Sequence, residues 1–173
     1  MFRIKGAKVT GCDGSAAVID MAARKYGLCN FNVVDLSATF PYDDDSYDIV
    51  FSNLVLMDID PLDTTIKEFS RILKKGGQLF FSVTHPAFYL AGWERGNDGI
   101  ITHKKVDGYI ACKNIEMQWG ELPVYHYHRP ISFYFNLLAR NGFSLSSMHE
   151  PEIYENAKVP DIPLFLFAEF IKM

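Results

Sequence analysis

Two acidic residues follow short apolar segments near the start of the chain. Asp13 comes directly after residues 8–12, and Asp35 ends the segment FNVVD. Continuous apolar segments of this length are typical of strands buried on both faces of a parallel sheet. An ionised carboxylate can accept two O–H bonds at once, as ribose binding requires. Asp13 therefore predicts a ribose contact, with capping of the helix that begins at Ser15 as its alternative.

Three polar side chains later in the chain are suited to acceptor chemistry. His85 follows the predicted strand QLFFSV, at the edge where open α/β sheets bind ligands. We predict it as a catalytic base or acceptor contact, and the alternative is a hydrogen bond to its own loop. In YHYHRP, alternation places His126 and His128 on one side of an extended segment. No third metal ligand accompanies them, so the prediction is no metal and a substrate-facing or structural role.

Other side chains could form the wall of a substrate pocket. Arg129 is suited to a substrate carboxylate, or equally to an ordinary salt bridge. Tyr89, Trp93 and Trp119 are suited to an aromatic wall, or to plain packing. We predict these four residues and His128 as the substrate contacts. The acidic run at 43–45 is interpreted as a solvated turn, because metal ligands must converge in space.

The elements that position these residues alternate in the βαβ manner up to about residue 90. Residues from Ser15 to Gly27 have helical apolar spacing, and Asp60-Pro61 is a typical helix start whose helix KKGG would end. Residues 92–129 are rich in glycine and predict an insertion or lid. A helix beginning near Ile131 and two closing antiparallel strands complete one predicted domain, residues 1–173.

Composition excludes several classes of protein. The chain has 173 residues, a formal charge of −4 and no basic stripe, so no nucleic-acid partner is expected. The apolar segment IPLFLFAEF is too short to span a bilayer, and no membrane partner is expected. The odd set Cys12, Cys29 and Cys112 argues against a disulfide framework and predicts a reducing, cytoplasmic location.

Taken in order, four segments resemble the class I S-adenosylmethionine-dependent methyltransferases of the type 11 group. They are GAKVTGCDGS, VVDLSATFPYDDDSYDIVFSNLVLMDI, IKEFSRILKKGGQLFFSVTHP and the C-terminal hairpin. The resemblance covers residues 6–90 well and 131–173 moderately, with 92–129 as a variable substrate region. It implies a Rossmann-like α/β fold, a mostly parallel sheet of strand order 3-2-1-4-5-7-6 with strand 7 antiparallel.

The resemblance also implies a cofactor, S-adenosyl-L-methionine, and a small-molecule methyl acceptor. Asp13 matches the acid that accepts both ribose hydroxyls, and Asp35 matches the acid that accepts from the adenine amino group. The turn-forming role of Asp35 is the alternative. The other implied cofactor contacts are Gly14 and Ser15 at the adenosine edge, Leu36 at the ring, and Asn53 and Leu54 at the methionine end.

The family's first strand and glycine-rich loop have no counterpart in the sequence, and we expect them upstream of Met1. Without that strand, KVTGC and DIVFS must pair with each other or with another chain, which predicts a homo-oligomer with weak or no cofactor affinity. Two alternatives remain open: a non-catalytic assembly module with a methyltransferase-like fold, and an NAD-dependent dehydrogenase.

Overall fold

In the computed structural model, the described residues are 6–120, 122–152 and 162–173, and the side chains of Trp119 and Leu122 are outside the description. The first unit contains strand β1 (Thr10–Asp13), helix α1 (Ala16–Lys25) and strand β2 (Asn30–Val33). β1 and β2 pair in parallel, the geometry that a helical crossover permits. Ser15 caps α1: its hydroxyl accepts the Val18 N–H at 3.4 Å.

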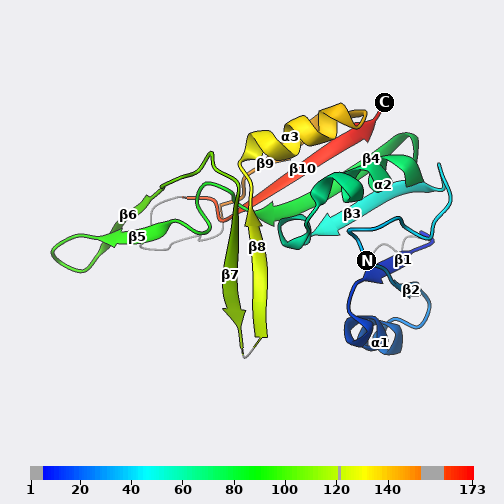
Figure 1. The fold of residues 1–173 in the computed structure, drawn as a ribbon, viewed down its shortest axis with the longest axis horizontal. Helices are drawn as coiled ribbons and strands as arrows, with labels where there is room; N and C mark the ends of the chain where they lie inside the picture. Colours follow the sequence, from blue (N-terminus) through cyan, green and yellow to red (C-terminus); the bar gives the residue numbers. More distant parts are fainter. Residues whose placement is uncertain (1–5, 121, 153–161) are drawn as a thin grey trace.

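A four-stranded sheet forms the centre of the molecule, in the order β3-β4-β10-β9 (Figure 1). β3 (Tyr47–Asn53) lies parallel to β4 (Leu73–Thr84), and β10 (Phe165–Lys172) lies antiparallel to both β4 and β9 (Phe143–His149). The predicted antiparallel C-terminal strand pair is therefore confirmed. Between β3 and β4 the chain forms the short 3-10 helix η2 (Leu56–Asp58) and helix α2 (Leu62–Ile72).

Residues 92–129 are more regular than the irregular patterning predicted. They contain two antiparallel hairpins: β5 (Gly92–Arg95) with β6 (Ile101–Lys105), and β7 (Lys113–Trp119) with β8 (Leu122–His128). Both hairpins project from the central sheet, and β8 leads into helix α3 (Ile131–Arg140) (Figure 1). The glycines suggested irregular structure throughout the segment. In these hairpins, however, most of them lie in the turns and few lie in the strands.

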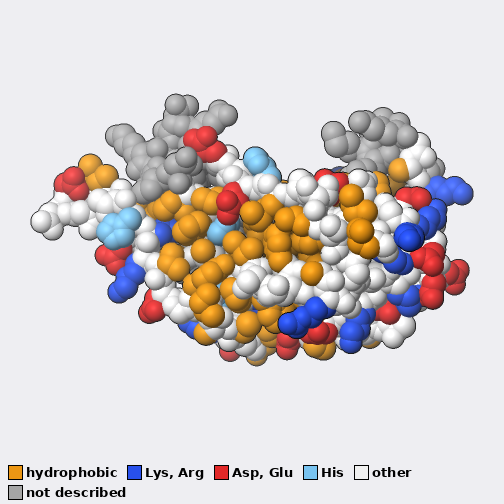
Figure 2. Space-filling view, turned by 90° about the horizontal axis from the view of Figure 1, so that it is seen from above, with side chains coloured by type: hydrophobic (Ala, Val, Ile, Leu, Met, Phe, Trp, Pro, Cys, Tyr) orange, Lys and Arg blue, Asp and Glu red, His pale blue; other side chains and the backbone are white. Residues whose placement is uncertain are grey.

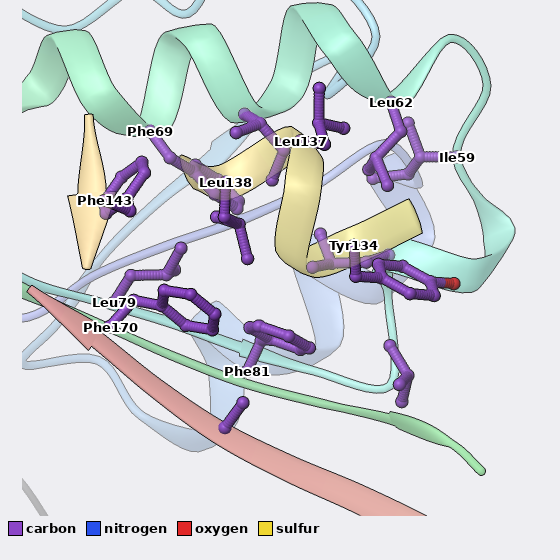
Figure 3. Packing of buried hydrophobic residues seen from close by; sticks show 14 of the residues in the cluster. Ile59, Leu62, Phe69, Leu79, Phe81, Tyr134, Leu137, Leu138, Phe143 and Phe170 are labelled. Atoms are coloured by element: carbon purple, nitrogen blue, oxygen red, sulfur yellow. The ribbon is translucent and has the colours of Figure 1, made fainter. Parts of the chain in front are cut away.

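The hydrophobic core lies between one face of the sheet and helices α2 and α3 (Figure 3). Pairing in register brings Leu79 opposite Phe170 and Val83 opposite Leu166, and all four side chains are buried. Phe81 stacks on both Tyr134 of α3 and Phe170, with ring centroids 6.2 and 6.0 Å apart. A shift by one residue would turn this set to the other face, so the core fixes the register.

Figure 2 shows hydrophobic side chains gathered across the middle of the face seen from above. Several sheet residues remain exposed, among them Ile49 on β3, Leu145 on β9 and Phe167 on β10. Patches of this kind on a monomer are often functional contacts.

Two expectations need correction. KKGG does not end α2, because the helix stops at Ile72 and residues 73–84 form the single strand β4, with Gly76 at φ +77° beside a register shift. Of the two alternatives for KVTGC and DIVFS, pairing with each other is wrong, and pairing with another chain stays a prediction. Their strands, β1 and β3, belong to separate sheets. Side chains of both strands instead line a small cavity of about 130 Å³.

Candidate functional site

A cleft of about 750 Å³ lies where β1, β2 and β3 end; we call it the strand-end cleft. Its position agrees with the general rule that open α/β sheets bind ligands beyond the carboxyl ends of their strands. Five of the predicted cofactor contacts line it, and η2 and β8 supply further walls. The lining comprises Asp13, Gly14, Val33, Asp35, Leu36, Ser37, Leu54, Val55, Asp58, Ile59, Asp60 and Tyr127.

Asp13 both shapes the turn after β1 and faces the cleft. Its Oδ1 atom accepts the Ser15 N–H at 2.8 Å, while the residue itself lines the strand-end cleft. In the described part of the chain, the second carboxylate oxygen forms no hydrogen bond. That oxygen can therefore accept from a hydroxyl-bearing ligand. The two roles predicted as alternatives are compatible, and Ser15 itself acts as the helix cap and does not line the cleft.

Asp35 closes the other side of the same cleft. Its Oδ1 atom accepts both the Ser37 hydroxyl, at 2.6 Å, and the Ser37 N–H, at 2.9 Å. The hydroxyl bond, followed by the backbone bond, lowers the pKa of Asp35. Hydrogen bonds to the charged form favour ionisation, so Asp35 stays an acceptor at neutral pH.

Asn53 and Leu54, at and directly after the end of β3, were both predicted as cofactor contacts, but the structure places their side chains differently. The Asn53 side chain is bound to β4, where its Oδ1 accepts the Ser82 hydroxyl at 2.7 Å, and Asn53 does not line the cleft. Leu54 does line it, with φ at +54° and its N–H donated to the Ser82 carbonyl at 3.0 Å. Because β4 holds this residue in place, Leu54 and not Asn53 faces the cleft.

A second cleft, of about 480 Å³, lies between η2, the end of β4 and the β7–β8 hairpin; we call it the hairpin cleft. It is lined by Met57, Asp58, Thr84, Tyr89, Met117, Pro123, Val124, Tyr125, His126 and Tyr127. Asp58 and Tyr127 line both clefts, so the two cavities are adjacent. A ligand in one cleft would therefore lie next to a ligand in the other.

His85, the predicted catalytic base, lies outside both clefts. Its ring is 2% exposed, stacks on Phe88, and accepts the Ala87 N–H at Nδ1, 3.2 Å away. The Nε2 atom lies 2.7 Å from Glu150 Oε1 and donates to it, because Nδ1 is the acceptor. With both nitrogens engaged, His85 has no lone pair for a substrate proton. The geometry corresponds to the alternative role, a histidine that binds its own loop.

Two predicted substrate contacts also have structural partners. Arg129 is buried and donates to the carbonyls of Leu56 and Ile59, at 3.2 and 2.8 Å, and to Asp60 at 2.8 Å. These bonds join β8 to the η2 segment. His128 is buried against Tyr109, whose carbonyl oxygen lies 2.8 Å from Nε2. Neither residue lines the strand-end or the hairpin cleft.

Of the two predicted aromatic residues whose side chains are described, Tyr89 lines the hairpin cleft and Trp93 does not. Trp93 lies in the β5–β6 hairpin, where the Lys104 ammonium sits 4.3 Å from its ring centroid. The side chain of Trp119 lies outside the described residues. Asp58 was not predicted as a site residue, because no motif marks it. In YHYH the prediction concerned the histidine side, and the hairpin cleft is lined by His126 and also by the alternating Tyr125 and Tyr127.

The acidic turn at 43–45 forms ion pairs with basic side chains of the protein. Asp44 lies 2.6 Å from Arg71, and Asp45 lies 2.9 Å from Lys172. Among the described residues, no three His, Cys, Asp or Glu side chains converge as metal ligands. Over the same residues, the helices are too short or too polar to cross a membrane.

Comparison with known proteins agrees with this geometry. A family model described as a methyltransferase domain matches residues 1–81. A demethylmenaquinone methyltransferase of Chlorobaculum tepidum is 36% identical over 77 residues, which are 44% of this chain and 31% of that protein. A crystal structure from Listeria monocytogenes, assigned as an S-adenosylmethionine-dependent methyltransferase, superposes with a TM-score of 0.84 at 28% identity and covers 96% of this chain and 80% of that one.

In sequence over residues 1–81, and in fold over nearly its whole length, the chain resembles the class I S-adenosylmethionine-dependent methyltransferases. The structural matches support the α/β class I methyltransferase fold, and S-adenosylmethionine is the cofactor that the matched structures are assigned. A second relative, the malonyl-[acyl-carrier protein] O-methyltransferase 1 of Coxiella burnetii, is 34% identical over 84 residues, 49% of this chain and 28% of that protein. The matches span about a third of these methyltransferases' own lengths.

A structure from Mesorhizobium loti, at 24% identity and a TM-score of 0.82, covers 95% of this chain and 80% of that one, and supports the methyltransferase fold. The matched family model ends at residue 81 and so excludes the β5–β8 hairpins that complete the hairpin cleft. The family resemblance in sequence therefore concerns mainly the strand-end cleft.

Proposed function

We propose that the protein transfers a methyl group from S-adenosylmethionine to a small-molecule acceptor. The observation that carries this proposal is the pair of adjacent clefts, which share Asp58 and Tyr127. Methyl transfer from a sulfonium is an in-line displacement, and the protein's main task is to align donor and acceptor. Two cavities that meet at common side chains provide that alignment.

The residues of the strand-end cleft suit the adenosine part of the cofactor. Asp13 offers a carboxylate oxygen to the ribose hydroxyls, and ionised Asp35 offers acceptor oxygens to the adenine amino group. Leu36 supplies an apolar contact to the base, and Leu54 one toward the methionine end. When bound, the cofactor supplies an electrophilic methyl group: the acceptor's lone pair forms the new bond to carbon as the carbon–sulfur electron pair returns to sulfur.

The acceptor is bound, in this proposal, by the hairpin cleft. The curated relatives support a small molecule only in a general way, since one is named for demethylmenaquinone and the other for malonyl-[acyl-carrier protein]. Their identities to this chain are nearly equal, at 36% and 34%. Sequence similarity thus does not choose an acceptor, and the side chains of the hairpin cleft must be considered directly. We also propose the cytoplasm as the location, since Cys12, Cys29 and Cys112 are all free thiols.

Calorimetry with S-adenosylhomocysteine and with NADH tests the proposed cofactor. We expect weak binding of S-adenosylhomocysteine and none of NADH, and we expect Asp13→Asn to weaken the former further, by about 1.5–3 kcal/mol, the range for a charged hydrogen bond. Circular dichroism checks that the variant folds, and Asp20→Asn on the exposed side of α1 is the matched control. Unchanged affinity in Asp13→Asn, or preferential NADH binding, would refute the proposal.

A further inference from the structure

The hairpin cleft has an unusual lining for its size. Three tyrosines, Tyr89, Tyr125 and Tyr127, contribute to it from two separate segments, and Met57 and Met117 add polarizable apolar surface. Tyr89 and Tyr125 are 38% and 50% exposed, so their rings are accessible to a ligand. Aromatic rings carry negative charge on their faces and attract cations that approach within about 6 Å of the ring centroid.

The charged and titratable groups of this cleft also favour a positively charged ligand. Among the described lining residues Asp58 is the only carboxylate, and none is a lysine or an arginine. The neighbouring Arg129 donates to the carbonyls of Leu56 and Ile59 and to Asp60, and its guanidinium carbon lies 5.3 Å from the ring centroid of Tyr127, so Tyr89 and Tyr125 are the rings left for a ligand cation. Burial lowers the pKa of His126, which keeps its ring neutral at neutral pH. The cleft is therefore anionic, and a carboxylate or phosphate ligand would meet repulsion without a compensating cation.

A bound cation would stabilise the ionised carboxylate of Asp58. Burial raises the pKa of its carboxyl, so the ionised form is penalised in the free protein. The potential ion-pair partner of Asp58 is His126, whose Nδ1 atom lies 3.9 Å from the carboxylate, but the His126 ring is neutral. In the described part of the chain no hydrogen-bond donor engages the Asp58 carboxylate. A positively charged ligand would supply the missing partner.

We infer that the hairpin cleft binds amines, and that the methyl acceptor is an amine nitrogen held between the tyrosine rings and Asp58. The assignment of the amine as the methyl acceptor rests on the proposed methyl transfer, whereas amine binding in the hairpin cleft does not depend on it. Because Asp58 lines both clefts, the nitrogen it holds lies on the side of the strand-end cleft. A carboxylic acid, ionised at neutral pH, would be repelled by Asp58, and a neutral phenol carries no positive charge for the ring faces and the carboxylate to attract.

The same carboxylate explains how a protonated amine becomes a nucleophile. An ammonium group has no lone pair, so it must lose one proton before it can form a bond to carbon. Asp58 can accept that proton, with His126 as a neighbouring acceptor 3.9 Å away. The charge balances: the neutral amine gains the methyl group and the positive charge that the sulfonium loses, and Asp58 passes the proton that it accepted to solvent.

Fragment binding tests the site without turnover. Benzylamine, benzyl alcohol and benzoate share one ring and differ in charge. With methyl-labelled methionines, the signals of Met57 and Met117 report on the hairpin cleft, and Met21 and Met148, which lie outside it, serve as internal references. We expect benzylamine to bind roughly tenfold more tightly than benzyl alcohol, as a partly desolvated cation–π contact and an ion pair would produce, and benzoate not to bind.

Variants separate the contribution of the Asp58 charge from that of the tyrosine ring. Asp58→Asn should remove most of the preference for benzylamine, whereas the matched control Asp20→Asn on α1 should preserve it. Tyr125→Leu should weaken amine binding several-fold, and Tyr125→Phe should restore it, because the ring face and not the hydroxyl attracts the cation. Circular dichroism checks folding in each variant.

Equal affinity for benzylamine and benzyl alcohol, tighter binding of benzoate, or an unaltered preference in Asp58→Asn would each overturn the inference. Failure of the proposed function has a different signature. There, benzylamine would still shift the Met57 and Met117 signals, while S-adenosylhomocysteine would not bind and Asp13→Asn would have no effect.

Discussion

The Arg129 guanidinium holds the η2 segment in place, and its removal should be among the most damaging single changes. Arg129 is 4% exposed and donates to two carbonyl oxygens, of Leu56 and Ile59, and to the Asp60 carboxylate. Arg129→Met has a similar length and no donor. Both carbonyls then lose a charged donor at about 1.5–3 kcal/mol each. The Asp60 side chain is 55% exposed, so its ion pair adds only a few tenths to about 1 kcal/mol.

These contributions overlap, and we expect a loss of about 3–5 kcal/mol in the free energy of unfolding, as for other broken buried charge networks. For a protein of this size, that corresponds to a fall of roughly 10 °C in the melting temperature. Urea denaturation followed by circular dichroism measures the change. Arg129→Lys should recover only part of the loss, because one ammonium group cannot bond both carbonyls with the geometry of the planar fork.

Asp60→Asn is the matched control, since it removes the exposed partner and keeps both carbonyl bonds. It should cost no more than about 1 kcal/mol. A cost below about 1 kcal/mol for Arg129→Met would refute the reasoning, and would mean that water satisfies the two carbonyls. A second consequence concerns the site: because η2 ends at Asp58, Arg129→Met should also weaken benzylamine binding, even where the variant remains folded.

Three further predictions concern packing in the core, the loss of stability at acid pH, and self-association. Phe81→Ala should lower the free energy of unfolding by about 3–5 kcal/mol in urea denaturation, since its ring is buried between two others; a loss below 1 kcal/mol would contradict the packing. The Arg71 hydrogen bonds lower the pKa of Glu68, so the stability they add is present above its ordinary pKa and is lost as pH falls through the lowered value. Melting temperatures of Glu68→Gln should therefore fall less steeply than those of the wild type below about pH 4.5, and parallel curves would exclude the linkage. Self-association remains a prediction: light scattering should show an oligomer that Ile49→Lys weakens, and a monomer at all concentrations would contradict it.

The sequence alone determined the first βαβ elements, the closing strands and two acidic residues of the strand-end cleft. Apolar segments and capping residues are local signals, so β1, α1, β2 and the antiparallel closing strands could be predicted from neighbours in the chain. Asp13 and Asp35 were found for the same reason, because each follows its strand directly. The structure brings both to one cleft.

The tertiary structure decided the remaining roles. Whether His85, His128 and Arg129 face a ligand or the protein depends on partners far away in the chain, such as Glu150 for His85 and Leu56 for Arg129. No periodicity encodes such contacts. Asp58 escaped notice because its significance lies only in being shared by two clefts whose walls come from the β3–α2 connection and from β8. Local patterns specify elements, whereas the packing of distant elements determines which polar groups are satisfied internally and which remain available to a ligand.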